Sequence, residues 1–113
     1  MVKLKLLATL TDVNDNPLPN KTIEFYRSTD RVNYQLLGTA TTDENGQAYI
    51  FDEVVTRGTY YYKARFPGDP DYDASEAEET FTYKPEEVVK RPWWALIVLD
   101  LAIKVGLSKV KER

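Results

Sequence analysis

Three aspartates, Asp69, Asp71 and Asp73, alternate along the short segment that runs from Gly68 to Ser75. Ca²⁺ takes carboxylate oxygens from loops of this kind, so calcium is a candidate cofactor. The segment lacks the glycine and the glutamate that an EF-hand needs at fixed offsets. Asp, Gly and Pro are also ordinary turn residues. The sequence therefore favours a plain turn at this point, with a calcium site as the alternative.

A second polar cluster, formed by Asp12, Asn14, Asp15 and Asn16, has the same two interpretations. Carboxylate and amide oxygens are ligands for hard cations, and these residues also favour turns. A shared cation site would require this cluster to meet the aspartates of residues 69–73 at one end of the fold. A turn is again the favoured interpretation.

Two further sets of residues could in principle carry out catalysis. Paired carboxylates hydrolyse glycosides when they flank a cleft and one of them has a raised pKa, but no cleft is indicated here. Serine nucleophiles need a base, and the chain contains no His and no Cys, which also removes imidazole bases, thiol nucleophiles and the usual zinc ligands. We therefore expect no enzymatic activity. The residues considered are Glu24, Glu78, Glu79, Ser28, Ser75 and Ser108.

A mixed aromatic and basic set lies on the segment that runs from Gly58 to Phe66. Tyr60, Tyr62, Ala64 and Phe66 alternate with Tyr61, Lys63 and Arg65, which is the period of a half-buried strand. The outward set of Tyr61, Lys63 and Arg65 could bind a sugar or a partner strand. A solvated sheet face is the simpler interpretation.

The same alternation defines the elements that would position these residues. Short runs with period two recur about every ten residues, separated by Gly, Pro, Asn and Asp, and Asn45-Gly46 is a strong hairpin signal. This pattern predicts an all-β antiparallel sandwich of about seven strands, with residues 58–66 as its central strand. The predicted strands are residues 3–12, 22–26, 34–41, 47–51, 58–66 and 76–83.

Charge is distributed unevenly along the chain. Residues 1–83 carry eight Lys/Arg against fourteen Asp/Glu, whereas residues 84–113 carry seven against four. An acidic body argues against nucleic acid as a partner, because nucleic acid favours a basic surface.

The last part of the chain has two possible periods. Residues 85–91 form a charged linker, and the segment after Pro92 alternates as a strand would but also fits a helix. A helix over 92–113 is favoured because Asp100 and Lys104 are four apart with the acid first. Pro92 also suits the first helical position, and the terminal basic residues suit the negative end of the helix dipole.

Such a helix would need something to cover its wide apolar face. One candidate is a membrane surface, because two tryptophans begin the segment and a basic cluster ends it. The other is protein, which could be the chain's own sandwich, a partner or further copies in a homo-oligomer. The residues expected to meet lipid or protein are Trp93, Trp94, Leu96, Leu99, Ile103, Leu107 and Val110.

Several short motifs within residues 3–83 resemble the Ig-like domains found in tandem in bacterial and archaeal cell-surface proteins. Relatives of these domains occur in invasin- and intimin-type adhesins. The resemblance implies an Ig-like fold that acts as a spacer, an adhesive surface or a filament unit, without a catalytic motif. The matching motifs are Thr11-Asp12 before Asn16-Pro17-Leu18, Lys21-Thr22-Ile23, Thr42-Asp43 before Asn45-Gly46, Gly58-Thr59-Tyr60, and Phe66 with Gly68, Asp69, Tyr72 and Ala74-Ser75.

These observations predict an Ig-like sandwich over residues 1–84, a linker over 85–91 and an amphipathic helix over 92–113. The expected function is that of a noncatalytic structural or adhesion module of a microbial surface protein, with the helix as membrane anchor or docking element. One alternative is a subunit of a homo-oligomeric filament or viral particle, and another is a calcium- or carbohydrate-binding module. No signal sequence precedes the first strand pattern, so the cytoplasm and the virion are alternatives to the cell surface.

Overall fold

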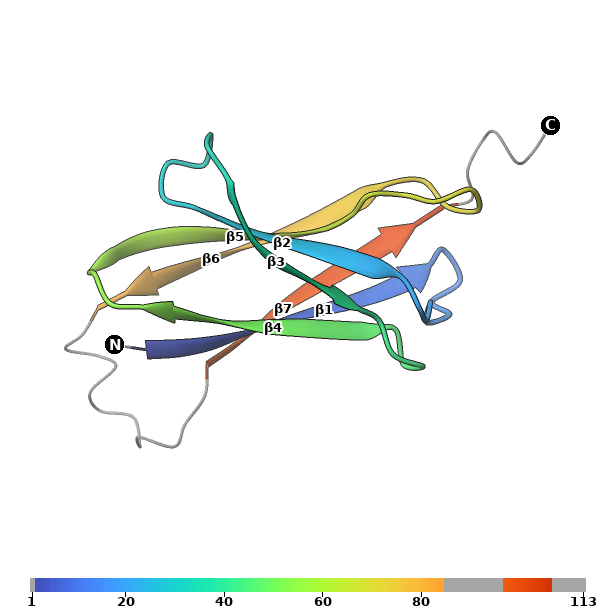
Figure 1. The fold of residues 1–113 in the computed structure, drawn as a ribbon, viewed down its shortest axis with the longest axis horizontal. Helices are drawn as coiled ribbons and strands as arrows, with labels where there is room; N and C mark the ends of the chain where they lie inside the picture. The colour runs from blue at the N-terminus through green and yellow to red at the C-terminus, as the bar shows by residue number, and fades with distance from the viewer. Residues whose placement is uncertain (1, 85–96, 107–113) are drawn as a thin grey trace.

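The computed structural model describes residues 2–84 and 97–106, and these residues form seven strands in two facing sheets (Figure 1). The all-β sandwich that the alternating pattern predicted is therefore confirmed. The strands are β1 (Val2–Asp12), β2 (Thr22–Ser28), β3 (Gln35–Thr41), β4 (Gln47–Val54), β5 (Gly58–Phe66), β6 (Ser75–Tyr83) and β7 (Ile97–Val105).

The two sheets have three and four strands. The smaller sheet has the order β4-β1-β7, and the larger has the order β3-β2-β5-β6. All neighbouring strands are antiparallel except β1 and β7, which run parallel from the pair Leu4 and Ile97 to the pair Asp12 and Val105. The strand predicted to be central, β5, is indeed an inner strand, between β2 and β6.

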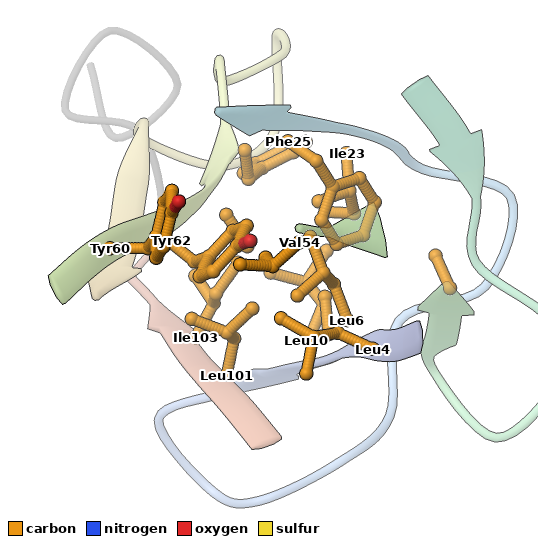
Figure 2. Packing of buried hydrophobic residues seen from close by; sticks show 14 of the residues in the cluster. Leu4, Leu6, Leu10, Ile23, Phe25, Val54, Tyr60, Tyr62, Leu101 and Ile103 are labelled. Carbon is orange, nitrogen blue, oxygen red and sulfur yellow. The ribbon is translucent and has the colours of Figure 1, made fainter. Parts of the chain in front are cut away.

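The core lies between the sheets and follows directly from the period of two. Along β1, Leu4, Leu6, Ala8 and Leu10 are completely buried, and the residues between them point outward. The opposite sheet contributes buried Ile23, Phe25 and Tyr62 among others, and the side chains of both sheets interdigitate (Figure 2). Removing this apolar surface from water is the main force that holds the sheets together.

The helix predicted over 92–113 is wrong for residues 97–105, which form strand β7. Leu101, Ile103 and Val105 are each 1% exposed within the core, while the residues between them face solvent. The backbone groups of β7 bond to β1, which would otherwise be an open edge of its sheet. The sandwich therefore extends beyond residue 84. The remaining parts of the predicted linker and helix, 85–96 and 107–113, lie outside the described residues.

A close contact between two turns fixes the end of the sandwich at which β1 and β7 finish. The amide of Leu10 donates a 2.8 Å hydrogen bond to the carbonyl oxygen of Gly46, and the amide of Leu18 donates one of 3.1 Å to the carbonyl oxygen of Leu10. Gly46 has a φ of 74°, the left-handed conformation that an Asn-Gly turn permits. The turn at residues 43–46 thus anchors the segment between β1 and β2. It is not the predicted hairpin, because the strands that it joins, β3 and β4, lie in different sheets and do not pair.

Candidate functional site

The aspartates of residues 69–73 form a turn that Asp69 organises. Its carboxylate accepts 2.8 Å hydrogen bonds from the amides of Asp71 and Tyr72, and its own amide donates to the carbonyl oxygen of Tyr72. The ammonium of Lys21 also donates to this carboxylate. Burial alone would raise the pKa of Asp69, but these hydrogen bonds and the Lys21 charge outweigh it and hold the pKa below its ordinary value.

This geometry gives no support to the predicted calcium site. Within residues 2–84 and 97–106, no three acidic side chains come together in a way that could hold a metal ion. The oxygens of Asp69 are engaged by Lys21 and by backbone amides, which suits a turn that needs no cation. The turn interpretation of Asp69, Asp71 and Asp73 is the one that the contacts favour.

The second polar cluster is likewise a self-contained turn. The carboxylate of Asp12 accepts hydrogen bonds from the amides of Asn14 (2.8 Å) and Asn16 (3.0 Å) and from the side-chain amide of Asn16 (3.1 Å). These bonds, led by that from the backbone of Asn16, lower the pKa of Asp12. Lys104, near the end of β7, places its ammonium 2.6 Å from Asp15 and so ties the last strand to this turn.

The outward row on β5 is engaged by neighbouring strands. The ammonium of Lys63 lies 3.2 Å from the carboxylate of Glu76, and the guanidinium of Arg65 lies 3.4 Å from that of Glu24. Tyr26 adds a 2.9 Å hydrogen bond to Glu24. Lys63 and Arg65 therefore form ion pairs within their own sheet. The sequence had left open a sugar site or a strand partner at this position.

The loop between β2 and β3 folds over this same face. Arg31 donates a 3.0 Å hydrogen bond to Glu78, Tyr34 donates to the other oxygen of that carboxylate, and the guanidinium of Arg31 lies 5.5 Å from the ring centre of Tyr61. The Tyr34 hydrogen bond and Arg31 lower the pKa of Glu78. A lowered pKa is the opposite of what a glycosidase acid requires, so Glu78 is unsuited to that role.

A cluster that the sequence did not reveal joins β2, β4 and β5. Asp52 accepts hydrogen bonds from the guanidinium of Arg27 (2.8 Å) and the hydroxyl of Tyr62 (2.7 Å). Burial, and then the hydrogen bond to Asp52, raises the pKa of Tyr62. Tyr62 was expected only as a core residue. Its hydroxyl crosses from the larger sheet to Asp52 on the smaller one, and no spacing in the sequence links these two residues.

The outer face of the β4-β1-β7 sheet carries a second arrangement that the sequence did not reveal. The ammonium of Lys3 lies 4.7 Å from the ring centre of Phe51, and that of Lys5 lies 4.4 Å from the ring centre of Tyr49. The two rings contact each other edge to face, with centres 5.5 Å apart. Tyr49 and Phe51 remain 51% and 46% exposed. The alternation of both strands put these side chains outward, but it did not give their register.

The residues assigned to a membrane or partner helix divide into two groups. Ile103 is buried in the core, and Leu99 packs partly buried against it, so neither has a side chain free to meet lipid or a partner. Among the described residues no helix is long and apolar enough to cross a membrane. The other five, Trp93, Trp94, Leu96, Leu107 and Val110, lie outside the described residues.

Comparison with known proteins supports the fold. No protein-family model matches the chain, and no curated protein matches it. Among solved structures it is similar to the TIE protein of Bacillus anthracis, with 25% identity and a TM-score of 0.53 over 91% of this chain. It is also similar to chlorocatechol 1,2-dioxygenase from Pseudomonas putida, with 11% identity and a TM-score of 0.52 over 93% of this chain.

The chain spans only part of each of these proteins: 17% of the TIE protein chain and 60% of the dioxygenase chain. At 11% identity the likeness to the dioxygenase concerns the fold alone. Neither protein is named as an invasin- or intimin-type adhesin, so the resemblance to their Ig-like domains remains a prediction.

Proposed function

We propose that this chain is a noncatalytic, load-bearing spacer module of a larger microbial surface protein. The observation that carries the proposal is the parallel pairing of β1 with β7. Because the first and last strands run side by side in the same direction, β1 begins at one end of the sandwich and β7 finishes at the other (Figure 1). Modules joined through such ends extend in a line, which is what a spacer requires.

The same pairing determines how the fold would respond to tension. The ladder runs over nine residue pairs, from Leu4 with Ile97 to Asp12 with Val105. Force applied between the two ends acts along these strands, so it loads the hydrogen bonds of the ladder together. An antiparallel pair pulled from adjacent ends would instead open one bond after another. The terminal strands therefore suit a part that must resist stretching.

Two further observations support the proposal. The chain corresponds in extent to about one sixth of the TIE protein, which is the proportion expected of one module in a long chain. Glu24 and Glu78, two of the carboxylates considered for catalysis, are engaged by arginines and tyrosines of the fold itself. Their contacts are those of structural residues.

Single-molecule force spectroscopy tests this function. The full chain is stretched once between its two ends and once between its N-terminus and a cysteine at position 55, where Val55 is 69% exposed. The second geometry pulls on the adjacent pair Val2 and Val54 and unzips β1 from β4. We expect a clearly higher unfolding force in the first geometry. Equal forces in both would contradict a load-bearing role, and a discrete oligomer in light scattering would favour an assembly subunit.

A further inference from the structure

Asn20, Lys21 and Thr22 form the only Asn-X-Ser/Thr sequence in the chain. An asparagine followed two residues later by Ser or Thr, with any residue except Pro between them, is the acceptor sequence for N-linked glycans in secreted proteins. Because a three-residue sequence also arises by chance, its structural context decides what it means. No hydroxyl residue stands at the required distance after the other four asparagines, which are Asn14, Asn16, Asn33 and Asn45.

The side chain of Asn20 is exposed and unoccupied. Asn20 lies in the bend before β2, and both Asn20 and Thr22 face solvent. The carboxamides of Asn16 and Asn33 donate hydrogen bonds to aspartates 3.1 Å and 2.9 Å away. Within the residues that the structure describes, the carboxamide of Asn20 has no such partner. Its nitrogen is therefore accessible from outside the fold.

The backbone, and not the side chain, anchors this bend. The amide of Asn20 donates a 2.9 Å hydrogen bond to the carbonyl oxygen of Thr42, and the amide of Thr42 donates one of 2.8 Å to the carbonyl oxygen of Lys21. Asn20 has a φ of 60°, a left-handed conformation that Asn adopts more readily than most residues. Glycine would satisfy this backbone at least as well. The Asn20 side chain is thus free to carry a large hydrated group.

The same hydrogen bonds indicate when a modifying enzyme can reach the sequence. Thr42 follows β3, so the bend cannot close until β3 has been synthesised. Because a chain is made from its N-terminus, Asn20 and Thr22 emerge well before Thr42 does. The acceptor sequence is unrestrained during synthesis, and its side chains stay exposed after folding.

We infer that Asn20 carries an N-linked glycan. The donor would be an oligosaccharide held on a membrane lipid through a diphosphate. The side-chain nitrogen of Asn20 forms a bond to the first carbon of the sugar and loses one proton, while the bond from that carbon to the diphosphate oxygen breaks and the lipid diphosphate leaves. Thr22 supplies the hydroxyl that the acceptor sequence requires. The inference rests on the proposed surface location, because the acceptor sequence is used in secreted proteins.

The position of Asn20 is compatible with the spacer function. Asn20 precedes β2 of the larger sheet, whereas the ladder of β1 and β7 belongs to the smaller sheet. The bend is tied to Thr42, next to the turn of residues 43–46, at the end of the sandwich where β7 finishes. A glycan at this place would leave the load-bearing ladder uncovered.

The test produces the full chain behind a cleavable secretory signal in yeast, together with the variants N20G, T22V and T22S. We expect one glycan on the wild type and on T22S, and none on N20G or T22V. N20G keeps the left-handed backbone and T22V keeps the side-chain shape, so circular dichroism should show that both fold. Trypsin releases residues 6–21 as one peptide, because Lys5 and Lys21 flank it. Enzymatic removal of the glycan in heavy-oxygen water labels the linked asparagine for mass spectrometry.

Three results would overturn the inference: a secreted wild type without a glycan, a T22V variant modified as fully as the wild type, and an unmodified Asn20 in the peptide of residues 6–21 from the cells in which this protein naturally occurs. The force measurement is a separate readout. A bare Asn20 with unequal unfolding forces would remove only the glycan. Equal forces with a glycosylated Asn20 would remove only the load-bearing role.

Discussion

The hydroxyl of Thr42 donates a 2.7 Å hydrogen bond to the carbonyl oxygen of Leu18, 24 residues earlier in the chain. The same hydroxyl accepts a 2.9 Å hydrogen bond from the amide of Lys21. Thr42 is only 2% exposed, so these backbone groups have little access to water as a substitute. One side chain thus joins the turn before β4 to the segment before β2.

Replacing this hydroxyl with a methyl group should destabilise the fold. We expect T42V to lower the free energy of unfolding by about 1–3 kcal/mol, because buried polar groups lose their partner while the side-chain shape is kept. Urea denaturation measures the change. T41V is the matched control, since Thr41 is exposed on β3. Equal stability of T42V and T41V would show that the bridge contributes nothing.

Gly46 should not tolerate a side chain. A β-carbon at this position would lie 2.5 Å from the carbonyl oxygen of Leu10, and φ is +74°. We expect G46A to cost about 1–3 kcal/mol from the backbone conformation, with the clash adding to it. In contrast, G38A meets open space and should be neutral or stabilising, by up to about 1 kcal/mol. Thermal unfolding of both variants tests the difference, and similar losses in both would refute the close approach.

Because β7 buries one face and exposes the other, substitutions on its two faces should differ in their effect on stability. Ile103 is 1% exposed in the core, whereas Val98 is 45% exposed on the other face of the same strand. I103A should cost about 2–5 kcal/mol because it leaves a cavity. V98A should cost less than about 1 kcal/mol, the range of strand propensity. If denaturation showed no loss for I103A, residues 97–105 would not be part of the sandwich core.

Acid should weaken the loop between β2 and β3 through Asp30. Its carboxylate accepts 2.8 Å hydrogen bonds from the amides of Val32 and Asn33, and these lower its pKa below the ordinary 3.8. A lowered pKa in the folded state gives stability that is present above pH 3.8 and lost as the pH falls further. The stability difference between the wild type and D30A should therefore shrink below pH 3.8. A difference that stays constant with pH would contradict this role.

Tyr34 should ionise late in an alkaline titration. Burial, followed by its hydrogen bond to Glu78, raises its pKa from 10.0 to about 12. Its contribution to stability is present below pH 10.0 and is lost as the pH rises through about 12. Tyrosinate absorbance of the wild type minus that of Y34F isolates this group. The E78Q variant should move the transition to lower pH, and an unchanged transition would remove Glu78 as a cause.

Much of the fold follows from the sequence because strands have a period of exactly two residues. The alternation in residues 3–12 and 58–66 assigned the buried faces of β1 and β5 correctly. Asn45-Gly46 marked a true turn, but the predicted hairpin was wrong, because this turn joins β3 and β4 of different sheets. These are local properties: a side chain's face is fixed by its parity along the strand, and a turn by the φ angles that its residues allow.

The contacts of the candidate site could be predicted less well from the alternation pattern. The outward position of Tyr61, Lys63 and Arg65 was predictable, but their engagement by Glu24, Glu76 and Arg31 was not. Similarly, Lys3 meets Phe51 across 48 positions of sequence, through a register that no local pattern specifies. The contacts of a sheet face depend on which strands pair and where, and that is a property of the whole fold.

Residues 97–105 show most clearly what the sequence determines and what only the tertiary structure decides. Their side chains fit both a helix with Asp100 and Lys104 on one stripe and a strand with Leu101 and Ile103 on one face. The sequence determined that this segment is apolar and must be buried, and of the two forms it favoured the helix, which was wrong for these residues. The tertiary structure decided for the strand, because the edge of β1 offers both backbone hydrogen-bond partners and a core for the alternate side chains.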